Sequence, residues 1–338
     1  MVTVANGTLK SVSVTTGSQR VSGSMSDERT WRSAGTLAYG KTYQVAVTAA
    51  DASGAVVEKT SQFTTLKPAS VAKVTFQANA LTGLKTGGTY GVGQPVIVAF
   101  SKDVKNREVA EKAMEVSTSP AVEGRWRWID KRTAHWRPAK YWASGTKISV
   151  KVDLAGTELG GGVYGSSAST HFTIGPSRIA IADAKTHRMK IYIDGKLVKD
   201  MPISMGKGGI VKGDRGQDVN YWTRSGVHVV MTKEQSHRMT SSSYGVTNPN
   251  DPNYYDEVIK LCCRITYSGE FVHMADWNIG SQGRANTSHG CINVGPANAR
   301  WFFDNFQLGD VVDVRNTPRK MALTDGVGGD WTIPWEKW

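Results

Sequence analysis

The chain has 338 residues, 39% of them hydrophobic and 21% charged, which is enough for two or three domains with apolar cores. Its 41 lysine and arginine residues outnumber its 29 aspartate and glutamate residues and give a net charge of +12. The lack of a nucleic-acid-binding motif or basic block argues against a nucleic-acid partner. The charge instead suits a solvated surface or an anionic polymer of the cell envelope. No apolar run reaches the roughly 18–20 residues of a membrane span.

The N-terminal part, residues 1 to 67, consists of short runs in which apolar and polar residues alternate. Tyr43–Ala49 is one such run, and the turn Asp51–Gly54 separates it from the run Ser61–Thr65. Alternation with a period of two, interrupted by turn residues, predicts β-strands joined by hairpins. This segment is typical of a small immunoglobulin-like sandwich, and Leu66–Pro68 is predicted to be a linker.

Residues 68 to 175 show the same alternation and predict a second, larger sandwich. Its strand-like runs include Pro95–Phe100 and Lys147–Val152. A weak internal repeat relates Gly40–Val47 to Gly145–Val152, and a closing strand-like run follows each of them. The two segments therefore predict tandem immunoglobulin-like domains. His135 lies among tryptophans, and we expect it to be a packed core residue rather than a ligand.

Residues 176 to 315 predict a third, β-rich domain. The strand-like runs lengthen here, and Asp194-Gly195 between two of them is a strong hairpin signal. A helix is predicted over Pro296–Phe306, because proline stands near its start, aromatic residues recur at helical spacing and Gly309 follows its end. The polar stretch Lys233–Val258 has no period. Irregular segments of this length are commonly functional, so we expect it to form a lid.

The C-terminal extension, residues 316 to 338, ends in an aromatic segment. Trp331, Trp335 and Trp338 fall within eight residues. Indole rings are costly to leave exposed because each buries a large apolar surface when it packs. We therefore expect the extension to pack back on the body of the protein, with sugar binding as the alternative.

The chemistry of the chain is concentrated around Cys291. His289 lies two residues before it, on the same side of an extended segment, and His273 lies one strand and one turn earlier. An imidazole beside a thiol can take its proton and generate the nucleophilic thiolate. Gly290 permits a sharp turn that would aim main-chain amides at a developing oxyanion. The alternatives for Cys291 are an inert buried thiol and a zinc ligand.

Cys262 and Cys263 weaken the zinc alternative. They are adjacent in a strand-like run, so their side chains should point to opposite faces, whereas structural zinc needs four ligands that usually come in spaced pairs. The odd total of three cysteines leaves at least one thiol unpaired and argues against a disulfide framework. We therefore expect no metal and no cofactor, and a nucleophilic Cys291.

His273 followed by Ser288-His289-Gly290-Cys291-Ile292-Asn293 resembles the active-site signature of the L,D-transpeptidases, the family with the YkuD-type catalytic domain. The resemblance covers about residues 177 to 315. Tandem immunoglobulin-like domains before this segment and a tryptophan-rich extension after it are similar to the mycobacterial branch. The resemblance implies a mainly β fold: two sandwiches, then a β-rich catalytic domain with one or few helices.

The resemblance also implies roles for individual residues. Cys291 matches the acyl-accepting nucleophile, and His273 matches the base that forms its thiolate. The main-chain carbonyl of Met274 would orient the imidazole of His273. The other matched residues are a structural histidine, an oxyanion donor, a lid tyrosine and three residues of the motif and substrate cleft: His289, Gly290, Tyr255, Ser288, Trp277 and Asn293.

The implied activity is two-step acyl transfer on peptidoglycan. Cys291 would attack the carbonyl between a diaminopimelate-type residue and the terminal D-Ala of a tetrapeptide stem, releasing D-Ala. The side-chain amine of another stem would then attack the thioester and form a 3→3 cross-link. Carbapenem β-lactams would acylate the same cysteine. The expected partners are thus stem peptides and carbapenems.

The implied location is the cell envelope. The first residues lack the basic start and apolar core of a signal peptide, so we expect export to depend on a segment outside this sequence. Any membrane attachment would use an N-terminal anchor that is likewise missing, with the sandwiches spacing the catalytic domain from it.

Two other functions stay open. If water replaces the amine, the same site is an L,D-carboxypeptidase or another hydrolase of wall peptides. The charge and the sandwiches also suit a non-catalytic protein that binds the cell wall.

Overall fold

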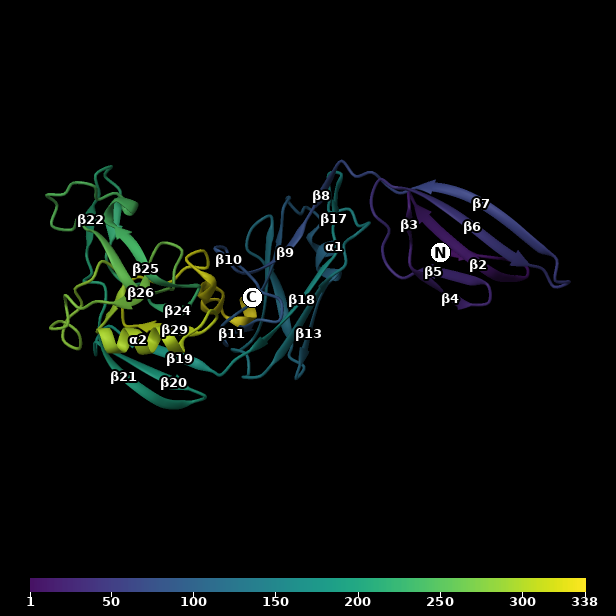
Figure 1. The fold of residues 1–338 in the computed structure, drawn as a ribbon. Coiled ribbons are helices and arrows are strands. Elements are labelled where there is room, and N and C mark those ends of the chain that lie inside the picture. The colour runs from purple at the N-terminus through teal and green to yellow at the C-terminus, as the bar shows by residue number, and fades with distance from the viewer. The chain divides into compact units, whose positions relative to one another are not determined.

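The computed structural model describes residues 1–338, and the chain is mostly β-strand, as the sequence predicts (Figure 1). Its residues pack into two compact units. One comprises residues 1–73, 101–113 and 152–167, and the other comprises residues 74–100, 114–151 and 168–338. The division of the chain into four segments, drawn from the sequence, stays a proposal. None of the helices is long and apolar enough to cross a membrane.

The N-terminal sandwich consists of a three-stranded sheet, β1-β5-β4, and a four-stranded sheet, β3-β2-β6-β7. The strand bounds are β1 Val2–Thr3, β2 Thr8–Thr16, β3 Gln19–Arg20, β4 Gly23–Asp27, β5 Thr30–Ser33, β6 Thr42–Ala50 and β7 Val56–Thr64. Alternate residues of β2 and β6 point inward and pack with Trp31 in a small apolar core. A cavity of about 760 Å³ in this sandwich is lined mainly by apolar side chains.

The following segment forms a five-stranded sheet, β10-β9-β12-β15-β14, and a four-stranded sheet, β11-β18-β16-β13. The strands of these sheets are β9 Val74–Asn79, β10 Thr82–Gly83, β11 Thr89–Tyr90, β12 Val96–Phe100, β13 Met114–Ser119, β14 Gly124–Trp128, β15 Thr133–Pro138, β16 Lys147–Val152 and β18 Ala168–Ile174. A short pair, β8 Ser70–Ala72 with β17 Val163–Gly165, and helix α1 Arg107–Lys112 complete the segment. In β16 every second residue is buried, which is the alternation seen in the sequence.

The C-terminal segment is built on a nine-stranded sheet with the order β24-β29-β19-β20-β21-β28-β27-β26-β25. Its strands are β19 Arg178–Asp183, β20 Arg188–Ile193, β21 Lys196–Ser204, β24 Gly226–Val229, β25 Thr232–Thr240, β26 Asp256–Arg264, β27 Phe271–Met274, β28 Ile292–Val294 and β29 Val311–Arg315. The remaining elements are β22 Ile210–Lys212, β23 Asp218–Asn220, α2 Pro296–Asn305, and the 3-10 helices η1 Ser241–Tyr244, η2 Val327–Thr332 and η3 Trp335–Lys337.

Two local predictions for this segment are confirmed. Asp194 and Gly195 both have positive φ and form the tight turn between β20 and β21. The predicted helix is α2, which starts at Pro296 and places Ala299, Phe302 and Phe303 in the main core. Pro296 suits this first position because its missing N–H would have no partner within the helix. The helix follows β28 directly, so its packing helps to fix the cysteine segment.

The prediction of an irregular segment over Lys233–Val258 is wrong at both ends. Residues up to Thr240 belong to β25, and β26 begins at Asp256, so only residues 241–255 lie outside the hairpin. β25 is the outermost strand of its sheet, and most of its residues are half-buried. Because neither face of this strand is fully buried, its sequence needs no alternation of apolar residues.

The predicted packing of the C-terminal extension is confirmed. The Trp331 indole donates to the carbonyl of Gly93 at 2.8 Å, and the Arg137 guanidinium lies 4.4 to 5.5 Å from the ring centres of the three tryptophans. His135 is buried, as predicted, and its Nδ1 contacts the carboxylate of Asp330 at 2.8 Å. The extension thus packs on the five-stranded sheet within one compact unit.

Candidate active site

The turn Ser288–Cys291 is held by two hydroxyl groups. Ser288 Oγ donates to the carbonyl of Cys291 at 2.7 Å and accepts the N–H of Gly290 at 3.1 Å. Thr223 Oγ1 donates to the carbonyl of Gly290 at 2.8 Å and accepts the N–H of Gly206 at 2.9 Å. Gly290 has φ +135°, a value that side chains strongly disfavour. The backbone at the cysteine is therefore fixed from both sides.

Cys291 is half-buried and stands directly before β28. Its thiol donates to the carbonyl of Gly269, with 3.7 Å between sulfur and oxygen. Burial raises the pKa of the thiol to about 12, and the main-chain N–H of Phe271 acts in the opposite sense. The resting group at neutral pH is consequently the thiol rather than the thiolate.

His273 lies on the strand next to the cysteine segment. β27 and β28 are parallel neighbours, with Val272 opposite Ile292 and His273 opposite Asn293. His273 Nδ1 donates to the main-chain carbonyl of Met274 at 2.8 Å, which leaves Nε2 as the acceptor of the ring. Burial lowers the pKa of His273 to about 4. The imidazole is therefore neutral at pH 7 and able to take a proton.

Two cavities meet at Cys291. One, of about 210 Å³, is lined by His273, Trp277 and Asn293. The other, of about 520 Å³, is lined by Gly290 and by several charged side chains of the surrounding strands. Tyr255 and His289 line both cavities, as Cys291 does. A peptide could thus reach the sulfur from two sides.

Aromatic rings pack together beside Cys291 in edge-on and tilted contacts. The His289 ring lies 5.0 Å from the rings of Tyr221 and of Tyr255, measured between centroids. Burial raises the pKa of Tyr255 to about 12, so its phenol keeps its proton and can donate a hydrogen bond. Burial also lowers the pKa of His289 to about 4, helped by the charge of Lys207. This histidine is packed among rings rather than paired with Cys291.

The other residues expected to bind substrate present different chemical groups to the site. Asn293 is buried, and its Oδ1 has no hydrogen-bond partner, so it can accept an N–H of a bound peptide. Trp277 is half-exposed and stacks on His273 with 6.0 Å between ring centres. The side chain of Met274 packs against the main core, so only its carbonyl faces the site.

The structure also shows that two expected site groups are already occupied. The hydroxyl of Ser288 is used within the turn, and the N–H of Gly290 donates to that hydroxyl instead of pointing freely at the cavity. Ser288 is therefore placed to brace the turn. Gly290 contributes its positive φ, whereas a role as oxyanion donor requires its present hydrogen bond to break.

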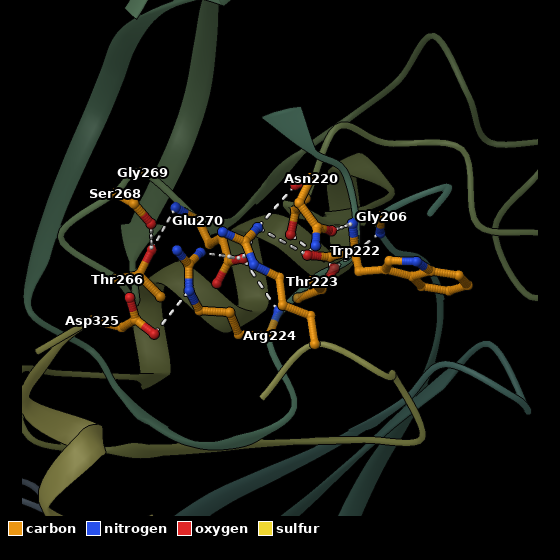
Figure 2. A network of polar contacts seen from close by, with 12 residues as sticks. Gly206, Asn220, Trp222, Thr223, Arg224, Thr266, Ser268, Gly269, Glu270 and Asp325 are labelled. Atoms are coloured by element: carbon orange, nitrogen blue, oxygen red, sulfur yellow. Dashed lines mark hydrogen bonds and ion pairs between the residues drawn. The ribbon is translucent and has the colours of Figure 1, made fainter. Parts of the chain in front are cut away.

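A buried charge cluster lies next to the turn, and Figure 2 shows its members Arg224, Glu270 and Asp325. Glu270 Oε1 is 3.0 Å from Arg224 Nη1 and 4.0 Å from Arg319 Nη1, and its Oε2 is 3.5 Å from His228 Nε2. Arg224 also pairs with Asp325 at 3.0 Å. The cluster adjoins the residue that holds Gly290, because Arg224 follows Thr223 in the chain. Ion pairing compensates the burial of these charges.

Neither this cluster nor Arg264 was predicted from the sequence. A signal for both existed, since Glu270 and Arg264 are charged residues within the otherwise apolar strand runs that lead to His273. Such residues in a buried strand require a partner or a function. The structure also keeps both other thiols away from a substrate, because Cys262 and Cys263 are fully buried whereas Cys291 lines both cavities. No group of three or more His, Cys, Asp or Glu residues is placed to hold a metal ion.

Comparison with known proteins assigns the chain to a family. Residues 177–314 match the L,D-transpeptidase catalytic domain, YkuD, and residues 1–158 match a bacterial Ig domain. The chain is 38% identical to L,D-transpeptidase 2 of Mycobacterium tuberculosis (strain CDC 1551 / Oshkosh), over 100% of the chain and 79% of that protein. It belongs to the L,D-transpeptidase family. The family predicted from the cysteine motif is thus confirmed, and the transpeptidase is an acyltransferase.

Solved structures of L,D-transpeptidases have the same fold. LdtMt1 in complex with imipenem is 29% identical, with a TM-score of 0.57 over 71% of this chain and 99% of that one. L,D-transpeptidase 3 from Mycobacterium tuberculosis, in complex with a faropenem-derived adduct, is 29% identical, with a TM-score of 0.55 over 72% and 98%. Both are β-lactam complexes of relatives.

We expect Gly290→Ala to impair this transpeptidase through backbone strain. A Cβ at Gly290 would lie 3.8 Å from the nearest atoms of Glu270, which is ordinary contact, so the cost comes from φ +135° alone. The expected loss of unfolding free energy is about 1–3 kcal/mol, with a parallel fall in acylation rate. Denaturant unfolding and single-turnover acylation measure both. Gly280→Ala is the matched control, because Gly280 has no positive φ and no atom within 4 Å of its Cβ position. Equal effects of the two substitutions would contradict the claim that backbone strain at Gly290 causes the loss.

Proposed function

We propose that the chain cross-links peptidoglycan by L,D-transpeptidation with Cys291 as nucleophile and His273 as base. The observation that carries the proposal is the placement of His273 on β27 and of Cys291 directly before the parallel neighbouring strand β28, with the His273 tautomer fixed by the Met274 carbonyl. The donor substrate is a tetrapeptide stem, and the acceptor is the side-chain amine of a diaminopimelate-type residue in another stem. The proposed place of action is the cell envelope, where a net charge of +12 favours contact with anionic wall polymers.

The first step forms a thioester. The thiol of Cys291 turns from the Gly269 carbonyl and passes its proton to His273 Nε2 as the sulfur attacks the carbonyl before the terminal D-Ala. Because both groups are neutral at rest, proton transfer accompanies the attack and no ion pair has to exist beforehand. The protonated His273 then gives the proton to the departing amine of D-Ala, and the C–N bond breaks.

The second step transfers the acyl group. The acceptor amine attacks the thioester carbon, and His273 takes a proton from this amine. The C–S bond breaks, and the proton returns from His273 to the sulfur of Cys291. The peptide bond formed joins the two stems, and the enzyme is restored with its thiol and imidazole neutral.

Other residues support these steps in the proposal. The neutral phenol of Tyr255 and the main-chain N–H of Cys291 are the proposed donors to the tetrahedral oxyanion. Asn293 Oδ1 accepts a peptide N–H, and Trp277 packs on the substrate and on His273. His289 and Tyr255 cover the sulfur and limit the access of water, which favours amine attack over hydrolysis.

A single incubation tests this proposal. The protein is mixed with a tetrapeptide stem and an excess of a diaminopimelate-containing acceptor, and the products are separated and weighed by mass spectrometry. The expected product is the cross-linked dimer with release of D-Ala. A tripeptide without dimer would make the protein a carboxypeptidase, and unchanged donor would leave only a wall-binding function.

We further propose that carbapenems acylate Cys291. The strained amide carbonyl of a β-lactam resembles the scissile carbonyl of the stem, and it needs the same attack by sulfur and the same proton from His273. The relatives solved with imipenem and with a faropenem-derived adduct support this extension.

The depressed histidine pKa values predict how pH acts on the protein. His273 and His289 have pKa values near 4 when folded instead of near 6.5, so the unfolded chain binds more protons between these values. The contribution of the two histidines to stability should therefore decrease as pH falls from about 6.5 to about 4, whereas that of Asp310, whose pKa burial raises to about 7, should increase. The acylation rate should stay flat between pH 7 and 5 and fall only as His273 is protonated near 4. Thermal unfolding and carbapenem acylation at each pH measure the two curves. An acylation midpoint near 6.5 would contradict the burial of the base.

A further inference from the structure

The 520 Å³ cavity beside Cys291 contains several cationic side chains, and most have an anionic partner. Arg224 pairs with Glu270 and Asp325. Arg238 makes two hydrogen bonds, at 2.8 and 2.7 Å, to the carboxylate of Asp256. Arg319 lies 4.0 Å from Glu270 and donates to main-chain carbonyls. Each of these arginines thus has a carboxylate partner within the protein.

Arg264 is the exception in this cavity. It ends β26 and is half-buried, with its guanidinium 4.3 Å from the ring centre of Phe271. Its contacts are long: 3.5 Å to the carbonyls of Thr266 and Tyr267, and 3.4 Å to His237 Nε2. No carboxylate forms an ion pair with it. A desolvated guanidinium with such weak contacts has donors available for an anion.

Arg264 lines the cavity without a carboxylate bound to its guanidinium. Glu234 attracts its charge, but the Glu234 carboxylate is engaged at 2.7 Å by His237 Nδ1. Phe271 covers one face of the guanidinium and holds its plane in position. Arg264 also favours the thiolate of Cys291, which places its charge within electrostatic reach of the reacting sulfur. An anion bound by Arg264 would therefore lie close to the bonds that form and break when the sulfur of Cys291 reacts.

The proposed reaction supplies such an anion in both steps. The D-Ala that leaves carries a carboxylate on the carbon next to its amine nitrogen. The diaminopimelate amine that attacks also sits on a carbon that carries a carboxylate. The departing and the arriving groups therefore have the same amine–carbon–carboxylate unit, and the thioester carbon exchanges one such unit for the other. A single carboxylate site serves both steps.

Resting on the proposed function, we propose that Arg264 binds this carboxylate and so positions first the leaving D-Ala and then the acceptor amine. The flat fork of the guanidinium matches a carboxylate through two parallel hydrogen bonds. The site thereby selects substrates whose reacting nitrogen is next to a free carboxylate over substrates in which that group is an amide.

Matched acid and amide substrates test this inference. Donors ending in D-Ala or in D-alaninamide are each combined with D-methionine or D-methioninamide as acceptor, and kcat/KM is measured for the wild type and for Arg264→Gln and Arg264→Lys. The wild type should prefer the free acids. Arg264→Gln should lose about 10- to 100-fold on the acids, with less than a threefold change on the amides, and Arg264→Lys should recover part of the loss. Arg238→Gln is the control, because its arginine lines the same cavity but is paired with Asp256.

The substrate pairs separate this role from other roles of Arg264. A purely electrostatic effect on the Cys291 thiol, or a folding defect, would slow acids and amides equally, and that result overturns the proposal. An unchanged acid-to-amide ratio in Arg264→Gln overturns it as well.

Binding to Cys291→Ser protein separates failure of this inference from failure of the proposed function. Calorimetry of the stem peptide as acid and as amide reports the carboxylate site without turnover. If no donor is transferred but the binding preference depends on Arg264, the carboxylate site stands and the proposed reaction does not. If the binding preference survives Arg264→Gln, the carboxylate site is refuted whatever the turnover.

Discussion

Replacing His273 with glutamine is expected to slow thioester formation by about 10²- to 10⁴-fold. The resting thiol has a pKa raised to about 12, so almost no thiolate exists at neutral pH without a base. Nε2 of His273 is the acceptor left free by the hydrogen bond from Nδ1 to Met274. Glutamine keeps hydrogen-bonding capacity but cannot take the proton. Single-turnover release of D-Ala from a tetrapeptide stem, followed by rapid quench, measures the step.

His289→Gln is the control for this prediction. His289 also lines both cavities and also has a depressed pKa, but its ring is packed between Tyr221 and Tyr255. We expect a loss of less than tenfold from this substitution, because the packing of the rings is disturbed while the proton acceptor stays. If His289→Gln slows the step as much as His273→Gln, or more, the assignment of the base is wrong.

Replacing Glu270 with glutamine is expected to destabilise the fold by about 3 kcal/mol, because it leaves buried arginine charge without its carboxylate. Glu270 is only 4% exposed and faces Arg224, Arg319 and His228. The same substitution should raise the reactivity of Cys291, since the negative charge of Glu270 raises the pKa of that thiol. Denaturant unfolding gives the first effect, and the pH dependence of alkylation by iodoacetamide gives the second.

Glu234→Gln is the matched control for the buried cluster. Glu234 pairs with His237, but its side chain is 36% exposed, so removing its charge should cost well under 1 kcal/mol. A thiol that becomes less reactive in Glu270→Gln, or a stability equal to that of Glu234→Gln, would contradict the account of the cluster.

Much of the fold was predictable because local signals agreed with the final packing. Pro296 and the aromatic spacing after it specified α2, and Asp194-Gly195 specified the β20–β21 turn. The proposed nucleophile and base could be named from the sequence because the residues around Cys291 are adjacent in the chain, and the structure places them next to His273 in the sheet. Such short-range motifs can be recognised without knowledge of the tertiary structure.

Other features depend on tertiary contacts that no local pattern contains. β25 is an edge strand with mostly half-buried residues, so its residues do not alternate. The partners of Glu270 come from Arg224 and Arg319, which are far from it in sequence. Likewise, Arg264 is distinguished by its lack of an anionic partner, and that property can be read only when the neighbouring carboxylates have been placed.

The hydrogen bonds of the cysteine turn could not be predicted from the sequence either. The motif indicated that Gly290 and Ser288 matter, but it could not show that the Ser288 hydroxyl accepts the Gly290 N–H. It likewise could not show that Thr223 holds the Gly290 carbonyl from another segment. These contacts change the proposed role of Gly290 from oxyanion donor to a residue that allows the positive φ of the turn.

Intact-mass analysis after exposure to a carbapenem tests the central claim, that Cys291 is the acyl-accepting nucleophile, most directly. The wild type should gain the mass of one carbapenem, and peptide mapping should place it on Cys291, because Cys262 and Cys263 are fully buried whereas Cys291 lines both cavities. Cys291→Ala should gain no mass under the same conditions. An adduct of equal yield on Cys291→Ala, or no adduct on the wild type, would contradict the claim.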